Sequence, residues 1–321
     1  MSFRTDLAVE VQEELQKHSS QHEGIKVDIQ NSGEDIIVTR VEITNEQGEK
    51  AMGKPLGNYV TLEFTNTDDD MHKISTLLSE EIKKVIKVKP NERFTTLVVG
   101  LGNWNITPDA LGPKVISKLM ITKHIFSEAR ELIDHNMSQV CAFSPGVLGI
   151  TGIETSQITQ GVIEKVNPDL IIAIDALASR KIERICSTIQ LTDTGIIPGS
   201  GVNNKRKALN KDALGVPVIA IGVPTVVDAA TVANDTIDIV IDKIIEQTPK
   251  GQAFYQMLSE IDKEEKEVMI KELLQPHIGD LLVTPKDVDR NITELSNIIA
   301  NAINLSLHPH MTLDEISAYI N

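Results

Sequence analysis

Three continuous apolar runs, which alternate with segments of helical periodicity, constrain the fold of this chain more than any other feature. The runs are T-T-L-V-V-G from Thr95, D-L-I-I-A-I-D from Asp169 and P-V-I-A-I-G-V from Pro217. Strands that are buried on both faces have this pattern, because neither face needs polar residues. Helices between such strands imply right-handed crossovers in a mostly parallel sheet. The sequence therefore predicts an α/β fold with helices flanking the sheet.

The N-terminal region has the pattern of antiparallel strands. The runs I-K-V-D-I-Q from Ile25 and I-I-V-T-R-V-E-I-T from Ile36 alternate on either side of the turn residues N-S-G-E-D. A third strand is predicted from Tyr59. Residues 67–87 carry apolar residues three and four positions apart, which predicts a helix. We expect these elements to form an elaboration that precedes the α/β core.

The remaining helices and the domain boundaries follow from the same periodicity. Helices are predicted at 110–125, 155–167, 226–247, 255–275 and 286–306, the last with Pro285 near its first turn. We expect an N-terminal segment at 7–90, an α/β core at 91–250 and a C-terminal helical region at 251–321 that packs on the core.

The charge and the cysteine content exclude several classes of protein. A formal net charge of −15 disfavours direct binding to nucleic acid or to anionic membrane. The chain has no run of about 18 apolar residues, so no membrane span is expected, and its first residues lack the apolar stretch of a signal peptide. Cys141 and Cys186 have no CxxC spacing and are expected to be free thiols in a reducing cytosol.

Two aspartates follow the predicted buried strands. In open α/β sheets, sites form outside the carboxyl ends of strands, and such ends are expected at 100–109, 175–180 and 222–228. Asp109 and Asp175 belong to the first two. If these ends meet, the two carboxylates cannot both ionise cheaply, so one keeps a proton. One then acts as a general base on water and the other protonates a leaving amine.

Each aspartate also has a purely structural interpretation. Thr107 can be a helix N-cap, with Pro108 as the first helical residue, and the helix dipole then favours an ionised Asp109. Asp175 can cap the turn A-L-A-S-R that follows it. The dipole argument makes Asp109 the better candidate for the base.

The glycines of G-L-G-N-W-N from Gly100 suggest a nucleotide site as an alternative, because glycines between a strand and a helix often hold phosphate. The third glycine of the dinucleotide fingerprint is missing, and no Lys followed by Ser or Thr marks a P-loop. A nucleotide-binding regulatory protein is therefore the weaker interpretation.

Several other motifs carry less chemistry. The tripeptide D-T-G at Asp193 occurs in aspartic proteases of all-β fold, and here it is interpreted first as a turn. Ser144 does not lie in a G-x-S-x-G elbow. The histidines are scattered, and H-P-H at His308 and His310 is interpreted as a surface loop. Carboxylates alone can hold a hard cation, so a metal-assisted site stays open.

Basic residues cluster near the second strand end and in a later loop. Arg180 follows Asp175, and Lys205 and Arg206 follow P-G-S-G. Solvated surface charges need no function. As a site, these residues would bind acidic side chains of a substrate.

Longer motifs resemble one family, the germination proteases of bacterial spores. They are R-T-D-L-A-V-E at 4–10, V-V-G-L-G-N-W-N-I-T-P-D-A-L-G-P at 98–113, S-P-G-V-L-G-I-T-G-I-E-T at 144–155, A-I-D-A-L-A-S-R at 173–180, T-D-T-G-I-I-P-G-S-G-V at 192–202 and G-V-P-V-I-A-I-G-V-P-T-V-V-D-A at 215–229. The resemblance covers nearly the whole chain. It implies an endopeptidase of atypical aspartic type whose two aspartates match Asp109 and Asp175, on a fold similar to that of the hydrogenase-maturation peptidases.

The resemblance also implies a zymogen that cuts itself. Family members degrade the small acid-soluble proteins that coat spore DNA, and they cut between an acidic and a hydrophobic residue. The run T-D-L-A-V-E from Thr5 matches that pattern, so cleavage is expected between Asp6 and Leu7 with residues 1–6 as a propeptide. The same segment also reads as the start of a helix with Asp6 as its cap.

Further expectations rest on the resemblance alone. They are small acid-soluble spore proteins as substrates, a homotetramer, and a place in the cytoplasm of the forespore and spore core. The hydrogenase-maturation peptidases use a metal, but their histidine ligand has no evident counterpart here, so neither a metal nor another cofactor is expected. A metal-dependent processing peptidase on the same fold is the alternative.

Overall fold

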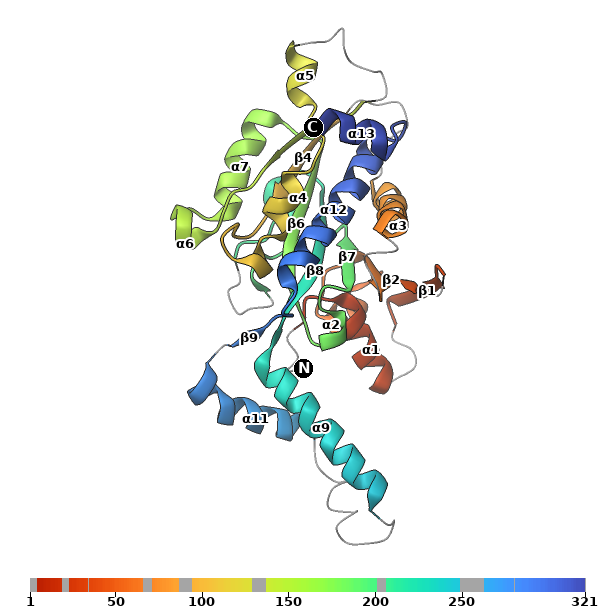
Figure 1. Ribbon diagram of the computed structural model, residues 1–321, viewed down its shortest axis with the longest axis vertical. Helices are drawn as coiled ribbons and strands as arrows, with labels where there is room; N and C mark the ends of the chain where they lie inside the picture. Colours follow the sequence, from red (N-terminus) through yellow and green to blue (C-terminus); the bar gives the residue numbers. More distant parts are fainter. Residues whose placement is uncertain are drawn as a thin grey trace.

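A mixed sheet organises the chain. The computed structural model describes residues 5–18, 23–33, 35–65, 71–86, 94–128, 137–200, 206–248, 263–279 and 281–320. Over these residues one nine-stranded sheet has the order β1-β2-β3-β7-β8-β6-β4-β5, with β9 paired to β8 (Figure 1). Helices flank the sheet, so the predicted α/β class is confirmed.

Parallel strands form one half of the sheet, where the apolar runs predicted them. The parallel pairs join β5 (Gln139–Phe143), β4 (Thr95–Gly100), β6 (Leu170–Ser179) and β8 (Val218–Asp228). The prediction missed β5, an edge strand whose sequence Q-V-C-A-F gives no long apolar run. All six residues of β4 are buried, as expected for a central strand covered on both faces.

The antiparallel half contains the predicted N-terminal strands. They are β1 (Ile25–Asn31), β2 (Ile36–Ile43) and β3 (Gly57–Phe64). The short strand β7 (Thr188–Thr192) pairs antiparallel with both β3 and β8 and so joins the two halves. The prediction missed β7, because the polar residues of T-I-Q-L-T hide a strand that is fully buried.

Different helices cover the two faces. On one face α3 (Met71–Val85) and α12 (Val288–Leu307) lie side by side over Ile172 and Ile174 (Figure 1). The opposite face carries Ile171 and Ala173, which pack with Ile163 of α7 (Thr155–Val166) and Leu214 of α8 (Lys211–Leu214). Since side chains alternate along a strand, Asp175 and Leu177 point to this second face.

The predicted helix at 110–125 is wrong. The structure has α4 (Leu111–Ile116) and a separate α5 (Lys123–Glu128). Between them, the Met120 N–H donates to Asn304 Oδ1 (3.0 Å) and the Thr122 N–H donates to the Val140 carbonyl (3.0 Å). These tertiary hydrogen bonds take the place of the helical ones, so the helix ends early.

The other predicted helices are present with shifted ends. They are α9 (Ala229–Gln247), which was expected from 226, α11 (Lys263–Ile278), α7 and α12. Residues 255–262 of the helix predicted at 255–275 lie outside the described residues, so only its end can be compared. β8 continues to Asp228, whose carboxylate accepts from the Ala230 N–H (2.8 Å) and caps α9. The remaining elements are α1 (Ala8–His18), α2 (Glu46–Met52), α6 (Leu148–Thr151), β9 (Leu282–Val283) and α13 (Leu313–Ile320).

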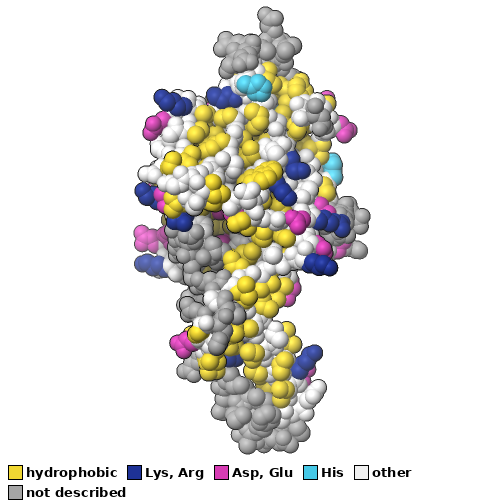
Figure 2. All heavy atoms as spheres, turned by 60° about the vertical axis from the view of Figure 1, so that its left-hand side comes forward, with side chains coloured by type: hydrophobic (Ala, Val, Ile, Leu, Met, Phe, Trp, Pro, Cys, Tyr) yellow, Lys and Arg dark blue, Asp and Glu magenta, His cyan; other side chains and the backbone are white. Residues whose placement is uncertain are grey.

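Helices α9 and α11 contact each other and form an arm that projects beyond the sheet (Figure 1). Large apolar side chains are exposed along it, and Figure 2 shows them on the surface of the arm. They include Ile239, Val240, Met269 and Leu273. None of the described helices is long and apolar enough to cross a membrane. Cys141 and Cys186 are free thiols, as predicted.

Candidate active site

Asp175 lies inside β6 and not at its end, which corrects the sequence prediction. The strand β4 ends at Gly100, the partner of Ile174, whereas β6 continues to Ser179 alongside β8. Asp175 is therefore the first residue of β6 beyond the last pair with β4. The strand end that opens the site belongs to β4, and β6 supplies a buried carboxylate beside it.

Asp109 reaches the same place because the loop after β4 folds back on itself. Gly102 has φ 106°, and a Cβ there would lie 2.0 Å from the Asp109 carbonyl oxygen. The next residue, Asn103, donates its N–H to that oxygen (3.0 Å). Only glycine permits this approach, so Gly102 holds Asp109 over the end of β4.

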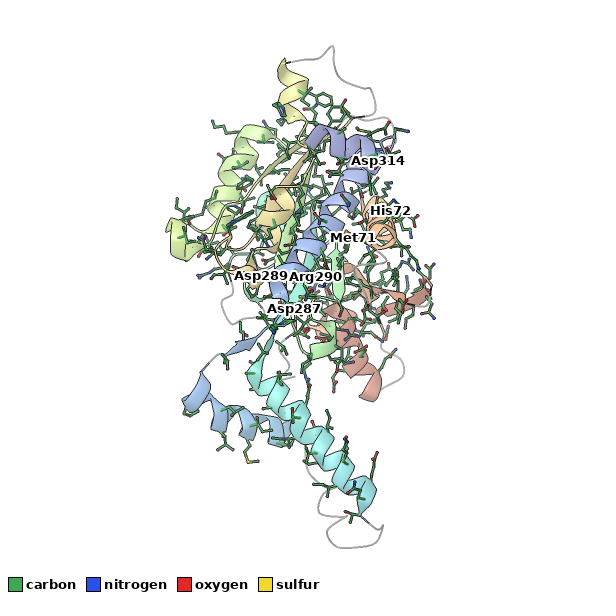
Figure 3. All side chains as sticks on the ribbon, in the orientation of Figure 1. Met71, His72, Asp287, Asp289, Arg290 and Asp314 are labelled. Carbon is green, nitrogen blue, oxygen red and sulfur yellow. The ribbon has the colours of Figure 1, made fainter. Side chains whose placement is uncertain are left out.

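The predicted N-cap at Thr107 is wrong. Thr107–Asp109 is a short 3-10 turn without a side-chain cap, and α4 begins only at Leu111. The Thr107 hydroxyl instead donates to Asp289 Oδ1 (2.9 Å) at the start of α12, where Figure 3 labels Asp289. One turn of 3-10 helix has little dipole, so the dipole argument for an ionised Asp109 fails.

Asp109 and Asp175 line one cavity of about 580 Å³, together with Asp6. Burial raises the pKa of Asp109 to about 6, against the opposing effect of the Asn103 backbone N–H. Burial raises the pKa of Asp175 well above its usual value, and the carboxylates of Asp109 and Asp6 raise it further. Burial thus favours the protonated form of both carboxyl groups, and the neighbouring carboxylates favour it further at Asp175.

The N-terminal segment runs along the side of β6 that β4 leaves open. The Asp6 N–H donates to the Ala178 carbonyl (3.1 Å), and the Ala178 N–H donates to Asp6 Oδ2 (3.0 Å). The Ser200 hydroxyl donates to Asp6 Oδ1 (2.6 Å). Two neutral donors thus hold the Asp6 carboxylate at the edge of the cavity.

The residues after Asp6 are held just as closely. Leu7 has no exposed surface and packs against Leu177 and Ile196. The Glu10 carboxylate accepts from the backbone N–H groups of Arg180 (2.7 Å) and Lys181 (2.9 Å). In the stretch T-D-L-A-V-E, the side chains of Leu7, Val9 and Glu10 are therefore buried, and Asp6 lines the cavity.

The sequence also singled out basic residues, which the structure places as follows. The Arg180 guanidinium forms a bidentate pair with Asp235 (2.7 and 2.8 Å), so its backbone and not its side chain contacts Glu10. Arg206 lines the cavity, with Nη1 3.8 Å from Glu154 Oε1. Lys205 lies outside the described residues.

Asp193 stands apart from the cavity. Its carboxylate accepts from the backbone N–H and from Nδ2 of Asn58 (both 2.8 Å), which ties the turn after β7 to β3. The interpretation of D-T-G as a turn agrees with this geometry. His308 is fully buried at the end of α12, so the interpretation of H-P-H as a surface loop is wrong for this residue.

Two residues that sequence reasoning missed touch the Asp6–Leu7 peptide. Lys54 Nζ (2.9 Å) and Gln190 Nε2 (3.1 Å) both donate to the Asp6 carbonyl oxygen. Gln190 lies between apolar neighbours in a buried strand, and this pattern could have marked it. Lys54 lies in the loop after α2, where nothing local distinguishes it. In the part of the chain that the structure describes, no three His, Cys, Asp or Glu side chains gather as a metal site.

Comparison with known proteins agrees with this geometry. The family described as "Germination protease" matches residues 4–252 and 242–320. Curated germination proteases of Clostridium perfringens and Clostridium tetani are each 53% identical over 326 residues, covering 100% of this chain and 99% and 100% of the relatives. That of Bacillus cereus is 42% identical and covers 99% of this chain and 97% of the relative. The chain therefore belongs to the germination protease family, a family of peptidases connected with spore germination.

Proposed function

We propose that this protein is an endopeptidase of atypical aspartic type in which Asp109 and Asp175 activate water. One observation carries the proposal: a peptide segment with an acidic residue followed by leucine brings that acidic residue, Asp6, to the cavity that both aspartates line. That segment is the chain's own Thr5–Glu10 stretch, with Leu7 enclosed. The cavity thus fits the peptide pattern that such an enzyme would cut.

The two raised pKa values give the aspartates different roles. Asp109, with a pKa of about 6, is ionised at neutral pH and takes a proton from water. The water oxygen bonds to the carbonyl carbon, and the C–N bond then breaks as Asp175 gives its proton to the amide nitrogen. The products are a carboxylic acid and an amine, and the proton on Asp109 returns Asp175 to its starting state through solvent.

We further propose that the enzyme is made as a zymogen that cuts its own Asp6–Leu7 bond. The enclosed Leu7 and the anchored Asp6 carboxylate support this role, because they hold the bond in one position. Its substrates in the spore are small acid-soluble spore proteins, which would present the same acidic–apolar pattern.

A homotetramer located in the cytoplasm of the forespore and spore core completes the proposal. The exposed apolar side chains of the arm formed by α9 and α11 support self-association, since monomers rarely expose such a patch without a partner.

A peptide that contains T-D-L-A-V-E tests the proposal. We expect the protein to cut it between Asp and Leu, and we expect Asp109→Asn and Asp175→Asn to lower kcat by several orders of magnitude. Asp193→Asn is the matched control, because it makes the same change of side chain in a turn that stands apart from the cavity. Cleavage products are identified by mass spectrometry.

Full activity in either Asp109→Asn or Asp175→Asn would contradict the aspartate mechanism. The metal-dependent alternative predicts that a chelator stops cleavage and that added divalent metal restores it. The aspartate mechanism predicts the same rate with and without the chelator.

A further inference from the structure

The carbonyl of the Asp6–Leu7 peptide accepts two hydrogen bonds from side chains. Its oxygen accepts from the ammonium of Lys54 (2.9 Å) and from the side-chain amide of Gln190 (3.1 Å). The same Gln190 side chain accepts from the Ala8 N–H through Oε1 (2.6 Å). Gln190 therefore hydrogen-bonds to the chain on both sides of Leu7. Because Oε1 accepts from the Ala8 N–H, Nε2 is the atom that faces the Asp6 carbonyl.

The sheet register places Gln190 in one row with Asp175. Gly222 of β8 is the partner of Gln190 on β7 and also of Asp175 on β6. Residues paired in register share a face, so both side chains rise from the same face with a glycine between them. A Cβ on Gly222 would lie 2.5 Å from Leu177 Cδ1, and Leu177 is the residue on which Leu7 packs.

Lys54, from the loop after α2, brings positive charge to the same oxygen. It follows Gly53, the left-handed residue that ends α2. Burial lowers the pKa of Lys54, and the carboxylates of Asp6 and Glu10 oppose that effect. Lys54 is half-buried, and the two carboxylates favour its charged form, so a charged donor there stabilises negative charge more strongly than in bulk solvent.

We infer that Lys54 and Gln190 form an oxyanion hole, that is, a pair of catalytic donors that stabilise the negative oxygen formed when water adds to the scissile carbonyl. The inference deepens the proposed peptidase function and rests on it. When the oxygen of water bonds to the Asp6 carbonyl carbon, the electron pair of the C=O bond moves to the carbonyl oxygen. The two N–H donors already point at that oxygen, so they need little rearrangement.

Two substitutions separate this role from simple docking of the peptide. Lys54→Met removes one donor at nearly constant volume. Gln190→Glu keeps an acceptor for the Ala8 N–H but cannot donate to the carbonyl, and it places negative charge beside the developing oxyanion. Loss of one such donor typically lowers kcat about 10²–10³-fold.

We expect both variants, after their own cleavage is driven to completion, to cut the T-D-L-A-V-E peptide with kcat lowered by about that factor and KM within about threefold of the wild type. Lys54→Arg should recover part of the loss, because it keeps a charged donor. Lys50→Met is the matched control, an exposed lysine of α2 that should cut at the wild-type rate. Thermal unfolding checks that every variant is folded.

The outcomes separate the two hypotheses. If the wild type does not cut the peptide, the proposed function is wrong and the inference falls with it. If the wild type cuts and the Lys54→Met and Gln190→Glu variants raise KM without lowering kcat, the residues only dock the peptide and the inference alone is overturned. A wild-type rate in both variants overturns it as well.

Discussion

At the scale of single residues, burial gives Asp109 both its chemistry and a cost in stability. Its carboxyl lies in the cavity without a paired cation among the described residues, and burial raises its pKa to about 6. A general base must be ionised to act, so the burial that raises the pKa of Asp109 also makes its active, ionised form less stable.

The pH dependence of cleavage follows from that value. Below about pH 6 Asp109 is protonated and cannot accept a proton from water, so kcat/KM for the T-D-L-A-V-E peptide should fall about tenfold per pH unit. Because the two aspartates are coupled, the midpoint belongs to the pair. A rate profile between pH 4 and 8 measures it, and circular dichroism over the same range checks that the fold persists. An acid limb centred near pH 4 would contradict a buried base.

Asp109→Asn should make the protein more stable at pH 7.5 while stopping cleavage. The folded state holds the Asp109 proton up to about pH 6, whereas the unfolded chain releases it near its ordinary value of 3.8. Stability is therefore lost as the pH rises between these values, and asparagine avoids that loss. We expect a gain of roughly 1–3 kcal/mol in the free energy of unfolding. The gain should vanish at pH 3.5, and urea titrations at both pH values measure it.

The candidate pair of aspartates could be predicted at this scale because each follows a recognisable apolar run. Lys54 could not, and for Gln190 the sequence offers only a polar residue between apolar ones, since the importance of both comes from a carbonyl that only the fold brings to them. The dipole argument for Asp109 chose the same base for a wrong reason. Local sequence cannot tell one turn of 3-10 helix from the first turn of an α-helix, nor how deeply a carboxyl will be buried.

At the scale of elements, α1 is fastened to the sheet by one buried arginine. Arg184 donates from Nη2 to Glu13 Oε1 (2.6 Å) and from Nε to Glu63 Oε1 (2.8 Å), and its Nη1 lies 3.6 Å from Glu10 Oε1. Glu10 and Glu13 belong to α1 and Glu63 to β3. Burial alone would raise the pKa of Glu13, but the hydrogen bonds that Arg184 and Lys181 donate to its carboxylate lower it.

Arg184→Met should loosen α1 from the sheet. It removes the Arg184 cation from Glu63 and leaves Glu13 with Lys181 alone, and breaking a buried pair in this way costs about 3–5 kcal/mol. We expect lower stability in urea and faster amide exchange in α1. Arg290→Met is the matched control, because the Arg290 side chain is exposed where it pairs with Glu294 on the same helix, and its loss should cost less than about 1 kcal/mol. Equal losses in the two variants would contradict the role given to Arg184.

The sequence predicted an element correctly where one hydrophobic periodicity continued over many residues. It failed where distant hydrogen-bond partners determine the secondary structure. The amphipathic pattern found α12 because its long apolar stripe packs against α3, α4 and the core. It overran α4, because Asn304 and Val140 take the hydrogen bonds of the residues that follow. It also missed β7, whose identity as a strand depends on β3 and β8.

At the scale of the whole molecule, β7 fuses two sheets of different character into one. The pair Tyr59 and Thr192 brings together segments far apart in the sequence. Because such pairing leaves no local signal, the sequence predicted an elaboration before the core but not its continuity with the core. The apolar and alternating patterns of the strands were enough to predict the α/β class, but the order of the strands in the sheet could be learned only from the structure.

The arm formed by α9 and α11 gives the prediction for assembly. If its apolar side chains hold a homotetramer of the 35.3 kDa chain, Ile239→Asp combined with Leu273→Asp should lower the mass measured by light scattering. Desolvating two added carboxylates opposes the contact. The exposed pair Ile29 and Ile37 on the other end of the sheet, changed to Asp, serves as the control. An unchanged mass in the arm variant would place the interface elsewhere.

The anchoring of Thr5–Glu10 has a consequence for the timing of activity. After the Asp6–Leu7 bond is cut, both new chain ends would stay bound. Ala178 and Ser200 still hold Asp6, and the backbone N–H groups of Arg180 and Lys181 still hold Glu10. The products of self-cleavage would therefore act as competitive inhibitors of the enzyme, because they would occupy the place of a substrate at high local concentration. Self-cleavage would not by itself start the cutting of other substrates. That activity would begin after a delay, whose length would depend on how fast the start of α1 moves away from β6.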